Sequence, residues 1–143
     1  MRYYDVVGRR DTNGTWLLTI PAFPEAASFG SIRAKAFKNA AKALQTTIAA
    51  RIKDNEPLPI PLDGSPTDNF LEVPPLLYLK GALYIGMREK GISRERLAQM
   101  LYAPEDRVDR LLAVDRNSEL GLLQAALRHV GIGMEVKVTG GTF

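Results

Sequence analysis

The segment Ile92–Leu112 constrains the fold most, because two helical patterns flank a short break at Tyr102-Ala103-Pro104. Ser93 can cap the first helix by accepting a hydrogen bond from a backbone N–H of its first turn. Ala98 is small where a second helix must cross closely. Apolar residues return at helical spacing on both sides of the break, at Leu97, Leu101, Val108, Leu111 and Leu112. This register predicts a helix-turn-helix, although a plain helical hairpin would show the same spacing.

A helix-turn-helix lays its second helix in the major groove of DNA, so the arginines of this segment are candidate DNA contacts. Arginine can bind phosphate or the edge of guanine, and the four candidates are Arg94, Arg96, Arg107 and Arg110. The second helix also carries three acids that repel phosphate, namely Glu105, Asp106 and Asp109. Tyr102 stands where such motifs usually have glycine, and a left-handed backbone there would cost a tyrosine about 1 kcal/mol. The pattern therefore favours the fold and leaves DNA contact as a hypothesis.

The composition excludes several classes of protein. No apolar run approaches the roughly 18 residues that a transmembrane helix needs, and the first residues contain no apolar core of a signal peptide. The absence of cysteine rules out disulfides, thiolate metal sites and a cysteine nucleophile. We therefore expect a cytoplasmic protein of bacterial type that does not associate with a membrane. A length of 143 residues allows one domain or two small ones.

Residues 1–61 are predicted to form a small α+β domain with the order β-β-(β)-α-β. A turn signal at Asp11-Thr12-Asn13-Gly14 separates the first two strands and predicts a β-hairpin. The three strands are expected at Tyr3–Val7, Thr15–Ile20 and Ala26–Phe29. A helix should follow over Ser31–Lys53, and its buried face should carry Phe37, Ala41, Leu44 and Ile48. The prolines of residues 57–61 keep that stretch extended, as an edge strand would be.

Residues 62–73 are predicted to be a flexible linker, because they contain Gly64, Ser65 and Pro66, three acids and no Lys or Arg. Residues 74–143 then form a second domain that is helical except for a terminal strand. One helix begins at Pro74-Pro75 and ends at Gly91, and the last is capped by Ser118 and ends at Gly131.

The terminal strand is predicted from the alternation of residues 134–138. Met134, Val136 and Val138 would share one face, and no other strand of the second domain is available to pair with them. An unpaired strand edge is a liability in water. We therefore predict that these three residues join two copies of the chain in a homodimer or a higher homo-oligomer.

A catalytic or metal site finds little support in the sequence, so we predict a protein that is not an enzyme and needs no cofactor. The only histidine, His129, lies near the end of the last helix, where interaction with the helix dipole or solvent explains it. A two-metal nuclease would need several converging carboxylates. Asp5, Asp11 and Glu25 are instead scattered over the first domain.

The order and spacing of several short motifs resemble the HicB-type antitoxins of bacterial toxin–antitoxin operons. The resemblance covers nearly the whole chain. Its motifs are Tyr4-Asp5-Val6, the stretch Gly14–Pro24, Gly30-Ser31, Asn39–Leu44, Leu58–Pro61, Val73–Leu76, Lys80, Leu83, Gly91-Ile92-Ser93 and Leu97-Ala98.

This resemblance implies a degenerate RNase H-like first domain that binds and neutralises a small HicA-type toxin, which cleaves mRNA. It also implies a second domain that binds operator DNA as a dimer or higher oligomer and so autoregulates the operon. The toxin contacts are expected among the bulky apolar residues near the turns of the first domain, Trp16, Phe23 and Phe29. One departure is that Arg33, Lys35 and Lys38 stand where family members commonly have acids.

Two other functions remain open at this point. One is a helix-turn-helix transcriptional regulator without a toxin partner, whose first domain senses a ligand or only oligomerises. A short, basic, histidine-containing product of the neighbouring reading frame would favour the antitoxin instead. The other is a nuclease, which metal-dependent RNA cleavage by the purified protein would reveal.

Overall fold

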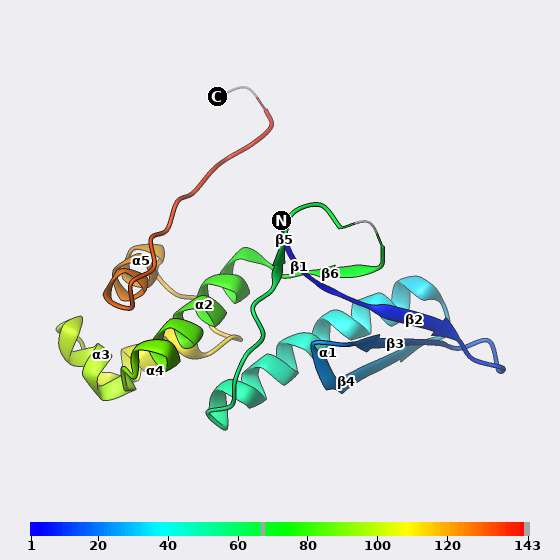
Figure 1. The fold of residues 1–143 in the computed structure, drawn as a ribbon, viewed down its shortest axis with the longest axis horizontal. Coiled ribbons are helices and arrows are strands. Elements are labelled where there is room, and N and C mark those ends of the chain that lie inside the picture. The colour runs from blue at the N-terminus through cyan, green and yellow to red at the C-terminus, as the bar shows by residue number, and fades with distance from the viewer. Residues whose placement is uncertain (67, 142–143) are drawn as a thin grey trace.

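The chain folds into two three-stranded antiparallel sheets and five helices within residues 1–66 and 68–141, which a computed structural model describes (Figure 1). The predicted α+β class is therefore confirmed. The first sheet has the strand order β5-β1-β6 and the second has the order β2-β3-β4. The strands are β1 (Arg2–Asp5), β2 (Val7–Arg10), β3 (Trp16–Ile20), β4 (Phe23–Gly30), β5 (Leu62–Asp63) and β6 (Phe70–Glu72).

The two sheets share one stretch of chain, because β1 and β2 are separated only by Val6. This residue is buried, and its N–H donates to the carbonyl oxygen of Asn69 at 3.0 Å. The predicted hairpin forms around the turn that contains Gly14, whose φ is +83°, but its first strand is β2 and not the predicted Tyr3–Val7, most of which lies in β1 of the other sheet. The third strand is longer than predicted, because β4 pairs with β3 along most of its length.

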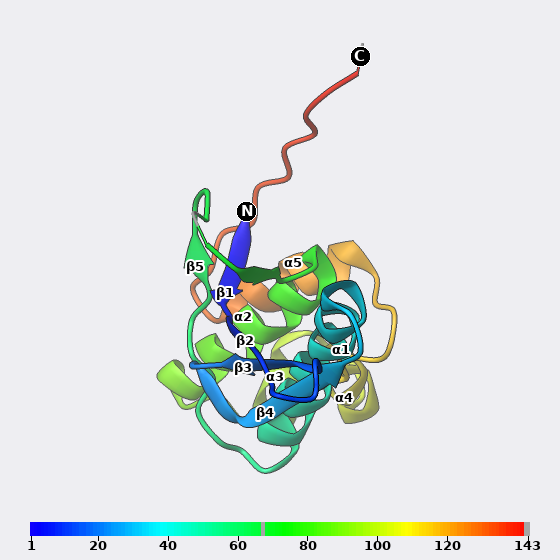
Figure 2. The ribbon, with the colours of Figure 1, turned by 90° about the vertical axis from the view of Figure 1, so that its right-hand side faces the viewer.

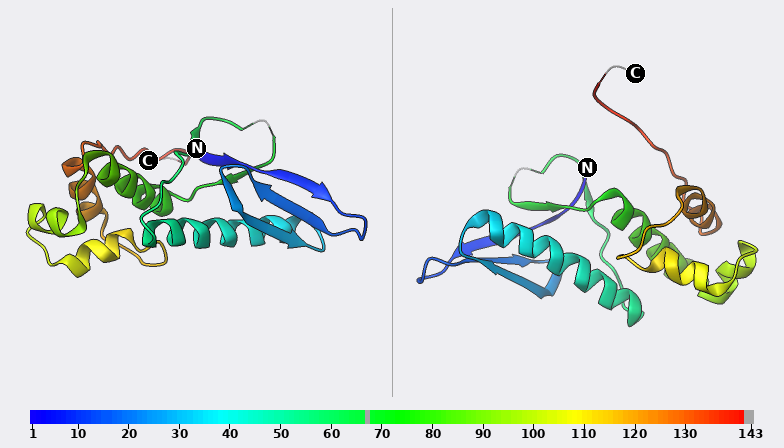
Figure 3. Two further views of the ribbon diagram at one scale, coloured as in Figure 1. Left: turned by 60° about the horizontal axis from the view of Figure 1, so that its bottom comes forward. Right: turned by 180° about the vertical axis from the view of Figure 1, so that it is seen from behind.

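Helix α1 (Arg33–Lys53) covers one face of the β2-β3-β4 sheet (Figure 3). Its buried residues are Ala36, Ala40, Leu44, Ile48 and Ile52, so the prediction is confirmed at Leu44 and Ile48, whereas Ala41 is exposed and Phe37 is only partly buried against the core. The reason is a close approach at Gly30, where an added Cβ would lie 2.3 Å from the backbone nitrogen of Ala36. Only a small side chain fits on the helix face that meets the strand so closely.

The predicted linker over residues 62–73 is wrong for the parts that form β5 and β6. Both strands pair with β1, one on each side, so a segment without strand-like periodicity gains its structure from β1. Residues 57–61 are extended but form no strand, and the edge strand lies at Leu62–Asp63 instead. An unpaired β1 would leave two open edges, which β5 and β6 close.

The second half contains helices α2 (Pro75–Lys90), α3 (Arg94–Met100), α4 (Glu105–Leu112) and α5 (Leu120–His129). The predicted start of α2 at a proline pair and its end at Gly91 are confirmed. Ser93 caps α3, as predicted, and accepts from the N–H of Arg96 at 3.0 Å. Ser118 does not cap α5, because Glu119 is the N-cap residue and the Ser118 hydroxyl binds Lys80.

The predicted strand at residues 134–138 is not formed within one chain. After α5 the backbone runs away from the rest of the structure, and Val136 and Val138 are exposed (Figures 1 and 2). No strand of the described residues lies beside this segment to complete a ladder. Among the helices of the described ranges, none is both long and apolar enough to cross a bilayer.

An ion pair between Glu25 of β4 and Arg51 of α1 should make stability depend on pH. The two groups are 2.7 Å apart, and hydrogen bonding from Arg51 lowers the pKa of Glu25 from 4.5 to about 2. A lowered pKa contributes stability above pH 4.5 that is lost as the pH falls toward 2. Glu25 is half exposed, so we expect a modest effect. In guanidinium unfolding, Glu25→Gln should be less stable than the wild type at pH 6 and equal to it near pH 2. A difference that stays constant over this range would contradict the assignment.

Candidate functional site

Helices α3 and α4 cross through a short turn, and their contact is apolar and closely packed. Leu97, Val108 and Leu111 are fully buried, and Ala98 is buried beside them. The turn residue Tyr102 has a left-handed backbone with φ +53°. This geometry presents α4 with one face packed and the other exposed to solvent.

The four candidate DNA-binding arginines lie in two different environments. Arg94 is held between the two helices, because its guanidinium lies 2.7 Å from the Asp109 carboxylate. Arg96 donates to the side chain of Gln99 at 3.3 Å. Arg107 and Arg110 are exposed on α4. They line a hollow of about 310 Å³, which Asn117 and Glu119 of the α4–α5 connection also line. The structure therefore brings Arg107 and Arg110 together on one surface, whereas Arg94 neutralises an acid.

A buried lysine fixes α4 in this position. Lys80 of α2 has no exposed surface, and its Nζ donates to the carbonyl oxygen of Arg110 and to the Ser118 hydroxyl, both at 2.8 Å. Burial lowers the pKa of Lys80, and nearby Asp115 partly opposes that shift. Since a cation near a helix C-terminus interacts favourably with the helix dipole, Lys80 ties the end of α4 and the following loop to α2.

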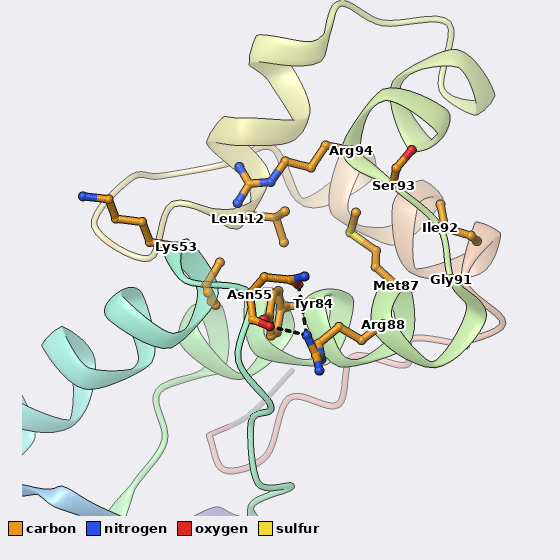
Figure 4. A pocket seen from close by; sticks show the side chains of 11 residues that line it. Lys53, Asn55, Tyr84, Met87, Arg88, Gly91, Ile92, Ser93, Arg94 and Leu112 are labelled. Atoms are coloured by element: carbon orange, nitrogen blue, oxygen red, sulfur yellow. Dashed lines mark hydrogen bonds between the residues drawn. The ribbon is translucent and has the colours of Figure 1, made fainter.

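A groove of about 530 Å³ separates the end of α1 from the start of α3 (Figure 4). Lys53 and Arg94 lie on its rim, and Met87 and Leu112 form part of its apolar floor. Across the groove from Arg94, the Arg88 guanidinium donates to both the backbone and the side-chain oxygen of Asn55. These bonds connect α2 to the residues that follow α1.

The predicted toxin contacts do not lie on one surface. Phe23 is fully buried, with its ring edge-on to Tyr4 at 5.0 Å, so its assignment as a contact residue is wrong. Trp16 is half-buried on the α1 side of the sheet, together with Leu18. Phe29 is 57% exposed on the opposite face, because it pairs with Leu17 across β3 and β4.

The face of the β2-β3-β4 sheet that α1 leaves uncovered carries several apolar side chains, of which Val7 and Phe29 are exposed. Cross-strand pairing places its members side by side: Val7, Arg9, Leu17, Thr19, Ala27 and Phe29. We call this set the outer sheet face. Sequence reasoning missed Val7, Leu17 and Ala27, although the consecutive Leu17-Leu18 pair is a signal that both sides of β3 carry apolar residues.

The acids of the first half do not form a metal site. Within residues 1–66 and 68–141, no group of three or more His, Asp or Glu residues could hold a metal ion. Glu25 binds Arg51 instead, while Asp5 and Asp11 lie exposed in β1 and in the hairpin turn. His129 is exposed in the last turn of α5, as its sequence position predicted.

A family model described as the HicB_like antitoxin of bacterial toxin-antitoxin system matches residues 3–82, more than half of the chain. The chain belongs to the HicB-like antitoxin family. "Antitoxin HicB" of Escherichia coli (strain K12) is 27% identical to it over 118 residues, which are 82% of this chain and 86% of the relative. "Antitoxin HicB" of Pseudomonas fluorescens (strain Pf0-1) is 27% identical over 119 residues, 82% of each chain. The predicted resemblance is therefore confirmed, and the family implies a toxin as a partner.

The family match ends within α2 of this HicB-like antitoxin. It therefore spans both sheets, the outer sheet face, α1 and Lys80, and it leaves out α3, α4 and α5. The aligned stretch of each relative is longer than the family match, so the similarity to the relatives extends into the second half.

Replacing Lys80 should destabilise this antitoxin through the loss of the α2–α4 connection. Lys80→Ala leaves the Arg110 carbonyl and the Ser118 hydroxyl without their donor and removes a fully buried side chain. We expect the free energy of unfolding to fall by about 2–4 kcal/mol in denaturant titrations. Lys42→Ala, at an exposed position of α1, should change it by less than about 0.5 kcal/mol. Equal stability of the two variants would contradict this role.

Proposed function

We propose that this chain is an antitoxin that binds and neutralises a HicA-type mRNA-cleaving toxin and represses its own operon by binding operator DNA. The proposal rests on the family match over residues 3–82, which includes the whole outer sheet face. The protein acts by binding and not by catalysis, and it meets both partners in the cytoplasm. Residues 1–61, with β5 and β6 completing the sheet of β1, serve as the toxin-binding domain, and residues 74–143 as the DNA-binding and oligomerisation domain.

The finer fold assignments support the same function. A hairpin, a further strand and a covering helix, in that order, are what a degenerate RNase H-like layer would need. In the second half, the packed α3–turn–α4 pair with its left-handed turn is compatible with a DNA-binding helix-turn-helix.

The toxin-binding surface we propose is the outer sheet face, with Phe29 as its principal contact. Exposed aromatic side chains contribute strongly when an interface buries them. Val7 and Phe29 are each 57% exposed on this face, and Leu17 lies between their strands. Trp16, the first residue of β3, is partly exposed beside Arg10, so it remains a candidate toxin contact.

Removing the Phe29 ring should weaken toxin binding with little effect on the fold. We expect Phe29→Thr to lower the affinity for the toxin about 30-fold, since loss of a central aromatic contact costs about 2 kcal/mol or more. The measurement is co-purification and calorimetry with the toxin encoded beside this gene, together with rescue of growth. Ile60→Thr removes an equally exposed apolar side chain away from the sheet and should bind like the wild type. Full neutralisation by Phe29→Thr would rule out this surface.

The DNA-binding surface we propose is the exposed side of α4, with Arg107 and Arg110 as phosphate or base contacts. Arg96 lies nearby on α3, and Arg94 supports the surface by pairing with Asp109. Met134, Val136 and Val138 provide the contact between copies. Met134 is partly buried against the core of its own chain, whereas the segment of Val136 and Val138 is exposed with its backbone unpaired, so a second copy can complete a ladder there.

Each arginine should contribute a measurable electrostatic part of operator affinity. Arg107→Ala and Arg110→Ala should each weaken binding to DNA upstream of this gene and reduce the slope of log K against log salt by about 1. Lys38→Ala removes an exposed charge from α1 and should leave both quantities unchanged.

Oligomerisation can be separated from DNA contact in the same titration. Val136→Pro removes a ladder hydrogen bond, so it should shift the protein toward monomer in sedimentation and weaken DNA binding in parallel. The two arginine variants should keep the oligomer intact. Unchanged DNA affinity in both arginine variants would exclude α4 as the DNA-binding helix.

A further inference from the structure

Four of the helices end in the same arrangement of hydrogen bonds. After α1, α2, α3 and α5, one residue adopts a left-handed backbone, and the N–H of the next residue donates to the carbonyl oxygen five positions back. This is the Schellman motif, which satisfies carbonyl groups at a helix end. The left-handed residues are Asn55, Gly91, Tyr102 and Gly131, with φ values of +55°, +65°, +53° and +83°.

Tyr102 differs from the other three in residue type. Glycine and asparagine adopt this backbone conformation readily, whereas a tyrosine is strained by its Cβ. At Ala103 the N–H donates to the Ala98 carbonyl oxygen at 3.0 Å, so the motif at the end of α3 is fully formed despite the strain. Glycine would form the same turn without it.

The Tyr102 side chain does not offset this strain by contacts within the chain. It is 99% exposed, and its hydroxyl makes no hydrogen bond with any residue in the described ranges 1–66 and 68–141. Its backbone N–H donates to the Gln99 carbonyl oxygen, a bond that any residue other than proline would make. Backbone strain that no contact within the chain offsets is a reason to look for a function of the Tyr102 side chain.

We propose that Tyr102 is a contact residue for duplex DNA, with its hydroxyl donating to a backbone phosphate and its ring lying against the sugar. The inference rests on the proposed DNA binding by α4 and adds a contact outside that helix. Tyrosine is among the side chains that bind phosphate oxygen in protein–DNA complexes. It is also uncharged, which suits a position three residues before an acidic helix start at Glu105 and Asp106.

The position of Tyr102 favours DNA over a protein partner. It precedes the N-terminal end of α4, the end that meets base edges in a helix-turn-helix. Exposed arginines lie on both sides of it in the sequence, Arg96 and Arg107. The outer sheet face, where the toxin is proposed to bind, lies at the opposite end of the molecule from α3 and α4 (Figures 1 and 3).

The test uses the full-length chain and two substitutions that relieve the strain, Tyr102→Gly and Tyr102→Asn. A duplex selected by the wild-type protein from a random pool serves as the probe, and affinity is measured by fluorescence anisotropy. We expect both variants to melt about 2–4 °C higher than the wild type. We expect both to bind the duplex about 5- to 30-fold more weakly. Leu120→Ala removes another exposed apolar side chain of the same half and should leave DNA affinity unchanged.

A higher melting temperature together with weaker DNA binding would support the proposal. Substitution of a residue with a purely structural role would change stability and DNA affinity in the same direction. Unchanged or tighter DNA binding by Tyr102→Gly would overturn it. A smaller oligomer of this variant in sedimentation, with DNA binding lost only as a consequence, would assign Tyr102 to contact between copies and overturn it as well. If the wild-type chain selects no duplex, DNA binding itself fails. If Arg107→Ala loses DNA binding while the Tyr102 variants keep it, DNA binding by α4 stands and only the Tyr102 contact is disproved.

Discussion

The end of α1 holds the two halves of the chain in one arrangement. The Tyr84 hydroxyl of α2 donates to the Glu56 carbonyl oxygen at 2.6 Å, and Arg88 donates to Asn55. Arg51, one turn earlier, pairs with Glu25 of β4 and donates to the Pro57 carbonyl oxygen. Carbonyl groups of the residues that follow α1 therefore become the attachment points of α2 and of Arg51, while the Glu25 carboxylate attaches the sheet.

This junction gives the antitoxin two surfaces in fixed relation. The β2-β3-β4 sheet lies at one end and the α3–α4 pair at the other, with α2 and the end of α1 between them (Figures 1 and 3). A protein bound to the sheet would leave α4 accessible, so under the proposed function toxin and DNA could be held at the same time. The buried core runs through both halves, from Leu18 and Leu44 to Leu83 and Leu127.

Local sequence patterns were sufficient to predict the hairpin, α1 and the α3–α4 pair, because each depends on periodicity and turn residues close in sequence. The strands β5 and β6 could not be found in this way, since they exist through pairing with β1, more than 55 residues earlier. The buried face of α1 was predicted correctly at Leu44 and Ile48 but not near the start of the helix, where the close packing of Gly30 against Ala36 favours small residues.

The site residues show the same limit. Arg107 and Arg110 could be grouped from helical spacing alone, whereas Phe23 could not be recognised as core without its contact with Tyr4. Lys80 gives no local sign of burial, because a lysine in an amphipathic helix is normally solvated. Its two acceptors lie 30 and 38 residues further along the chain, and only the tertiary fold brings them to it.

Under the proposed DNA binding, the charges of α4 give the tail after α5 a role. The helix carries three acids and two arginines, and the Arg94–Asp109 pair neutralises one acid, which leaves the exposed side close to neutral. Affinity for DNA grows with the number of phosphates that a protein neutralises, so one copy has few contacts to offer. Two linked copies add their contacts on one duplex when their helices are about one helical turn apart. The unpaired backbone at Val136 is the element of the second half that can supply this link, because the helices are already packed in the monomer.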